Sequence, residues 1–268
     1  MQRSFSSPAL VLRVRPSGES NREATFLSAE EGVLGATLFG GPKSRLRSHV
    51  SPFNSGILWT YRDPAKDFRK VSDFDVQSWR PGLRELYERS SAASFIAGAI
   101  LAGHGGGGAF SEAFALANAA LDALSCADES FCERILLHFL WNWAGLLGTR
   151  GNDIQRCASC ACEWPLDAVL WFIPGEGFLC KKCMIEEHGD TETGRKHGGS
   201  KTGAMLGPGA RRWLVAAGDR PVLELSRVSL DAPSLKELKA LMKIMEEPLV
   251  GGKNSRWSGV NQALLQTM

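Results

Sequence analysis

No stretch of this 268-residue sequence approaches the roughly 18 consecutive apolar residues that a membrane-spanning helix requires. The most apolar segment, Ile135–Leu147, is interrupted by His138 and Asn142. The first ten residues also lack the apolar core of a signal peptide. We therefore expect a cytoplasmic protein with reduced cysteines and no membrane partner.

Two motifs of catalytic sites are also missing. The nucleotide-binding pattern G-x-x-x-x-G-K-[ST] does not occur, because no lysine follows Gly103–Gly108 and Ser200 separates Gly199 from Lys201. Zinc deaminases need a His-x-Glu motif, and none of the five histidines is followed by glutamate two positions later. The sequence therefore predicts no enzymatic activity, no catalytic residue and no small-molecule substrate.

The sequence has little net charge, because 31 Lys and Arg residues face 29 Asp and Glu residues. Affinity for a polyanion must then come from local clustering of cations. Residues 1–72 hold eleven cations against six acids, and Lys43, Arg45 and Arg47 lie within the glycine-flanked segment 40–49. We predict that this segment binds phosphates; the alternative is a solvated surface loop.

Five short extended segments predict a β-barrel of the OB type in the first 80 residues. The first alternates Leu10, Leu12 and Val14 with more polar positions, and the second and third flank a hairpin turn at Gly32. Four further cations on these strands are expected to border the basic segment 40–49. The predicted nucleic-acid contacts are Arg13, Arg15, Lys43, Arg45, Arg47, Arg69 and Lys70. Three aromatic residues are expected in the core rather than on a base-stacking surface: Trp59, Tyr61 and Phe68.

The remaining sequence predicts helices, so the fold class is α+β with more than one domain. Ser130 and Glu133 form a capping-box pattern at the start of the strongest helix. A second amphipathic helix carries a lysine edge that would suit an acidic peptide, formed by Lys236, Lys239 and Lys243. The expected organisation is an OB-fold domain (1–80), a helical domain in two parts (81–155 and 210–268), a zinc-finger insertion (156–187) and a flexible insertion rich in glycine and lysine (188–209).

Four of the seven cysteines form two C-x-x-C pairs, Cys157 with Cys160 and Cys180 with Cys183, separated by nineteen residues. This spacing predicts a four-thiolate Zn²⁺ site, which leaves no open position for substrate and therefore stabilises structure. Disulfides are less favoured because they need an oxidising compartment. Three other residues stay open as substitute ligands: Cys162, His188 and His197.

Three sequence blocks occur in an order that resembles the RecO family of bacterial recombination mediators. The first is Gly40–Leu46 followed by Ser51-Pro-Phe53, the second is Phe131–Leu137 leading to the first cysteine pair, and the third is Lys253-Asn-Ser-Arg256. The resemblance spans nearly the whole chain. It departs from the family pattern after the first cysteine pair, where Ala161 replaces the usual glycine.

The resemblance implies a non-enzymatic DNA-repair protein that binds single- and double-stranded DNA and anneals complementary strands. It also implies partnership with RecR and with the acidic tail of single-strand-binding protein, in loading recombinase onto coated DNA near the nucleoid. Two other functions remain open, because OB barrels and zinc knuckles also occur in RNA-binding or transcription-associated modules, and the chain could be a protein-interaction scaffold.

Overall fold

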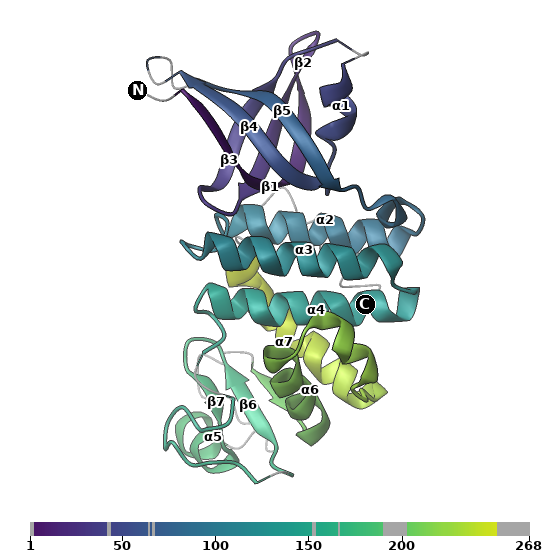
Figure 1. Ribbon diagram of the computed structural model, residues 1–268. Helices are drawn as coiled ribbons and strands as arrows, with labels where there is room; N and C mark the ends of the chain where they lie inside the picture. Colours follow the sequence, from purple (N-terminus) through teal and green to yellow (C-terminus); the bar gives the residue numbers. More distant parts are fainter. Residues whose placement is uncertain are drawn as a thin grey trace.

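The computed structural model describes residues 3–41, 44–63, 65, 68–151, 154–165, 167–189 and 203–250, with side chains to residue 245 (Figure 1). A β-barrel lies at one end, two long helices cross its base, and further helices and a small sheet follow at the other end (Figure 1). Among the described residues, no helix combines the length and the apolarity needed to cross a membrane.

The barrel closes from five strands in the order β1-β2-β3-β5-β4, with β3 and β5 parallel and the other pairs antiparallel. A short helix, α1 (Arg45–His49), connects β3 to β4. The strand bounds are β1 Ser4–Ser17, β2 Asn21–Ser28, β3 Gly32–Leu38, β4 Ser55–Asp63 and β5 Phe68–Ser78. The predicted OB-type barrel is therefore confirmed.

Strand β1 is buried on both of its faces. Ala9, Val11 and Val14 pack in the barrel core, whereas Leu10 and Leu12 pack against the helices. The predicted alternation of Leu10, Leu12 and Val14 on one face is wrong, because the register with β2 shifts between Val11 and Arg13. A bulge of this kind reverses which face the following residues occupy. The outward leucines are what hold the barrel on the helices.

The helical region buries small and aromatic side chains in one continuous core with the outer face of β1. Its elements are η1 Pro81–Arg84, α2 Tyr87–Ala102, α3 Phe110–Cys126, α4 Glu129–Leu146, α6 Pro208–Asp219, η3 Val222–Arg227 and α7 Ala232–Val250. The predicted capping box at Ser130 is wrong: Asp128 caps α4 and accepts a hydrogen bond from the Phe131 N–H at 2.8 Å. Ser130 instead donates to the Asp128 carboxylate from inside the first turn.

A small three-stranded sheet is inserted between α4 and α6, in the order β7-β6-β8. It consists of β6 (Leu170–Ile173), β7 (Gly177–Leu179) and β8 (Ala204–Leu206), with α5 (Lys181–His188) after β7. The flexible insertion expected over 188–209 is therefore wrong at its ends, because α5 reaches His188 and β8 pairs with β6. Residues 190–202, including His197, lie outside the described residues.

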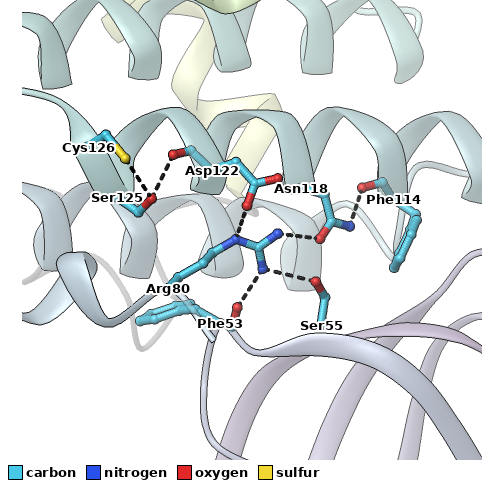
Figure 2. A network of polar contacts seen from close by, with 8 residues as sticks. All are labelled: Phe53, Ser55, Arg80, Phe114, Asn118, Asp122, Ser125 and Cys126. Atoms are coloured by element: carbon cyan, nitrogen blue, oxygen red, sulfur yellow. Dashed lines mark hydrogen bonds and ion pairs between the residues drawn. The ribbon is translucent and has the colours of Figure 1, made fainter. Parts of the chain in front are cut away.

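Arg80 joins the barrel to the helices through a buried polar network (Figure 2). Its guanidinium donates to the carbonyl of Phe53 at 2.7 Å and to Ser55 Oγ at 3.1 Å, both on the barrel side. On α3 it donates to Asn118 Oδ1 at 2.7 Å and to Asp122 Oδ1 at 2.6 Å. Its own side chain is only 3% exposed, so the Arg80 guanidinium meets its hydrogen-bonding needs through these partners in both parts.

His138 is a buried packing residue of α4, as expected for a lone histidine on an apolar helix. Its Nε2 lies 3.2 Å from the carbonyl of Arg220, while the buried Nδ1 has no hydrogen-bond partner. Burial lowers the pKa of His138 below 6.5, although the hydrogen bond to Arg220 opposes this shift. A proton on Nδ1 would be an unpaired charge in the core.

Protonation of His138 is expected to destabilise the fold as pH falls below about 6.5, where the unfolded chain binds a proton that the folded chain does not. The stability that this histidine contributes is thus present above that pH, and its loss approaches about 1.4 kcal/mol per pH unit. Urea unfolding of the protein and of His138→Gln between pH 5 and 8 measures the effect. The two curves should converge toward low pH; parallel curves would contradict the assignment.

Candidate metal centre and nucleic-acid interface

The two cysteine pairs meet beside the small sheet. Cys157 and Cys160 lie in a turn closed by a hydrogen bond from the Ala161 N–H to the Cys157 carbonyl. Cys180 follows β7 and caps α5, its sulfur accepting from the Cys183 N–H at 3.4 Å. The Sγ atoms of all four cysteines lie within 4.8 Å of one another. The chain therefore brings two knuckles, separated by a hairpin, to one point.

This sulfur cluster fits a metal ion. The Sγ atoms of Cys160 and Cys180 are 3.9 Å apart, and two ligands in a tetrahedral thiolate site are separated by about 3.8 Å. The Cys180 N–H lies 3.4 Å from the Cys157 sulfur, a hydrogen bond that favours thiolate. Hydrogen bonds from Cys162 and Cys183 lower the pKa of the Cys160 thiol to about 6, whereas burial raises the pKa of the Cys180 thiol. A four-sulfur set leaves no position for a reacting molecule.

Two of the three substitute ligands, Cys162 and His188, lie outside this set of four sulfurs. Cys162 is exposed, and its carbonyl accepts a hydrogen bond from the Cys157 N–H at 3.0 Å. His188 is 2.7 Å from the Glu176 carboxylate instead. Ala161 holds a left-handed backbone with φ of 56°, a conformation that glycine adopts without cost. The knuckle thus keeps the turn despite the missing glycine, at a strain of about 1 kcal/mol.

The predicted cations are spread around the barrel. Arg45 is 73% exposed and lies 3.6 Å from Asp73, whereas Arg47 is half-buried and its Nε has no hydrogen-bond partner. Lys70 stands over the Tyr61 ring, with Nζ 5.0 Å from its centroid. Lys43 lies outside the described residues. Arg45 is on α1, which packs against β5, the strand that carries Lys70.

The remaining cations have partners or lie elsewhere. Arg69 is bound to Glu31, with 2.6 Å between Nη2 and Oε2, so its charge is largely neutralised. Arg13 and Arg15 lie on the part of β1 that pairs with β2. Burial lowers the pKa of Arg13, and the neighbouring Arg15 lowers it further. Contact between these three arginines and nucleic acid stays a prediction.

Two exposed aromatic side chains were not recognised in the sequence. Trp59 was expected in the core but is 47% exposed on β4, because it occupies an outward position between buried Leu58 and Thr60. Phe39 follows β3 and is equally exposed. Its position directly before Gly40 and Gly41, where a strand ends, is the signal that could have marked it as a surface residue.

The geometry defines the class: an OB-barrel protein whose helical part carries a closed four-cysteine site. Residues 1–78 match the family model described as recombination protein O N terminal. The chain is 30% identical over 183 residues to the DNA repair protein RecO of Pelotomaculum thermopropionicum, which covers 67% of this chain and 68% of the relative. It is 26% identical over 184 residues to the DNA repair protein RecO of Desulfitobacterium hafniense, and this match covers 68% of this chain and 65% of the relative.

The chain belongs to the RecO family of DNA repair proteins. The family resemblance inferred from the three sequence blocks is thereby confirmed, and with it a role in DNA repair and recombination.

Proposed function

We propose that the protein is a non-enzymatic recombination mediator that binds single- and double-stranded DNA and anneals complementary strands. Exposed Arg45 and half-buried Lys70 on the OB barrel support this proposal, because cations beside two strands screen the repulsion between their phosphate backbones. Annealing then needs no covalent chemistry. Family membership favours this function over an RNA-binding module or a scaffold. An annealing assay with complementary oligonucleotides, bare or coated, tests it; no acceleration over the spontaneous rate would refute it.

We further propose Zn²⁺ as the ion of the cysteine site. Thiolate ligands in a tetrahedral set suit zinc, which has no redox chemistry and stabilises small folds. Cys157, Cys160, Cys180 and Cys183 would hold it. Its role would be structural, in keeping with a protein that acts on DNA through the barrel in the bacterial cytoplasm.

Replacing Lys43, Arg45 and Arg47 together by alanine is expected to weaken DNA binding to a similar degree for unrelated sequences. Each phosphate contact that is lost reduces the number of counterions released on binding. The magnitude of the slope of log K for DNA binding against log salt concentration should therefore fall by about 0.7 per contact on single strands. Fluorescence anisotropy over a salt series measures this slope. The matched control replaces three exposed cations away from the barrel, Lys182, Arg227 and Lys236. Equal slopes in the two variants would rule out the segment.

RecR and the acidic tail of single-strand-binding protein are the proposed protein partners. One groove of about 610 Å³ lies between α2, α4 and α7, but four of its lining residues are acids: Glu88, Asp128, Glu129 and Glu133. Lys239 in this groove is paired with Glu133. An acidic tail would be repelled there, so we assign it instead to the exposed side of α7 that carries Lys236 and Lys243.

A further inference from the structure

A hollow of about 650 Å³ opens on the barrel wall between the end of β3, helix α1 and the start of β5. Among the described residues, its lining consists of four apolar side chains, one cation and one hydroxyl, and includes no acid. The lining residues are Phe39, Leu46, Phe68, Lys70, Val71 and Ser72.

Two phenylalanine rings form one side of this hollow. The centroids of Phe39 and Phe68 are 6.0 Å apart and their planes are inclined by 59°. At this inclination the rings do not cover each other face to face, and Phe39 is 47% exposed. An aromatic face of this kind, left open beside buried Val71, suits a flat apolar group of similar size.

The charge around the hollow selects what kind of flat group fits. Lys70 is on the rim, where the Tyr61 ring supports its ammonium at 5.0 Å. Arg45 directly precedes Leu46, which lines the hollow. Its side chain is 73% exposed and forms an ion pair with Asp73. A ligand that complements these groups has a planar ring and a neighbouring negative charge, as a nucleotide has. In a duplex the ring faces are stacked on neighbouring pairs, so only an unpaired nucleotide can insert.

We propose that this hollow binds one unpaired base of a single strand, with Phe39 as the stacking surface and Lys70 contacting the adjacent phosphate. The inference rests on the proposed DNA binding and deepens it, because it gives the barrel a means to distinguish single strands from duplex. A mediator with such a site holds bases unstacked before they pair.

The test compares Phe39→Ala with the wild-type protein on three probes: an oligo-dT strand, the same strand with consecutive abasic sites, and a duplex. Phe39→Ala should weaken binding to oligo-dT by about tenfold, the usual effect of losing one stacked base. Binding to the abasic strand and to the duplex should stay unchanged. Phe39→Tyr should restore affinity, whereas Phe39→Leu should not, because leucine keeps the apolar volume but not the ring.

The control variant is Tyr87→Ala, which removes an exposed aromatic side chain from the helical region. The inference is overturned if Phe39→Ala binds oligo-dT like the wild type, or if the abasic strand suffers the same loss. Should Phe39→Ala fail to fold, the Phe39→Leu and Phe39→Tyr pair decides the question alone. A wild-type protein that binds none of the three probes would refute the proposed function itself, which separates the two failures.

Discussion

A protein with Cys157→Ser is expected to lose the proposed Zn²⁺ and to melt on the order of 10 °C below the wild type. The large fall in melting temperature is expected because the four sulfurs hold together part of the core of the helical region. Cys157 and Cys183 are buried in the same core as β6, β7 and the long helices. Serine is a poor ligand for zinc, so the ion leaves and the two knuckles separate.

Elemental analysis and calorimetry measure these two effects. The matched control is Cys162→Ser, which alters an exposed thiol that hydrogen-bonds Cys160 but is not one of the four clustered sulfurs. It should retain about one metal per chain and melt like the wild type. Chelation of the wild-type protein should reproduce the Cys157→Ser melting curve. Normal metal content in Cys157→Ser, or metal loss in Cys162→Ser, would show that the ligand set is different.

Arg80→Met is expected to cost about 3 kcal/mol of unfolding free energy, even though methionine fills much of the same volume. The cost arises because buried Ser55 and the half-buried Phe53 carbonyl and Asn118 side chain all lose their donor. Asp122 contributes less, since its side chain is 58% exposed and can be hydrated.

Guanidinium unfolding of Arg80→Met and of Arg84→Met separates the network from the general loss of an arginine. Arg84 lies in the same turn but makes exposed hydrogen bonds to Ser51 and Pro52, so its replacement should cost under about 0.5 kcal/mol. Limited proteolysis should also cut Arg80→Met faster between the barrel and η1. Equal stability of the two variants would mean that the network is not what joins the two parts.

The sequence predicted the features that depend on local spacing. The C-x-x-C pairs fix which sulfurs can approach one metal, and Gly32, with φ of 73°, marks the β2–β3 turn. The sequence did not reveal features that depend on tertiary contacts. The bulge in β1 arises from pairing with β2, and the burial of Leu10 and Leu12 depends on helices far along the chain.

The candidate nucleic-acid surface shows the same division. The exposed position of Arg45 followed from its polar surroundings, but the neutralisation of Arg69 required a glutamate 38 residues away. The hollow beside Phe39 is formed by three segments that no local pattern connects. The number of cations can therefore be read from the sequence. Whether each cation is free to contact a phosphate or is already paired with an acid depends on the fold.

The two buried faces of β1 also limit how the protein can be divided. A fragment that ends at residue 78, where the family model ends, would retain every strand of the barrel. It would nevertheless expose Leu10, Leu12 and Leu27 to water and would lack Arg80. The barrel is therefore expected to unfold together with the helices, and to become soluble as a separate domain only if those leucines are replaced by polar residues.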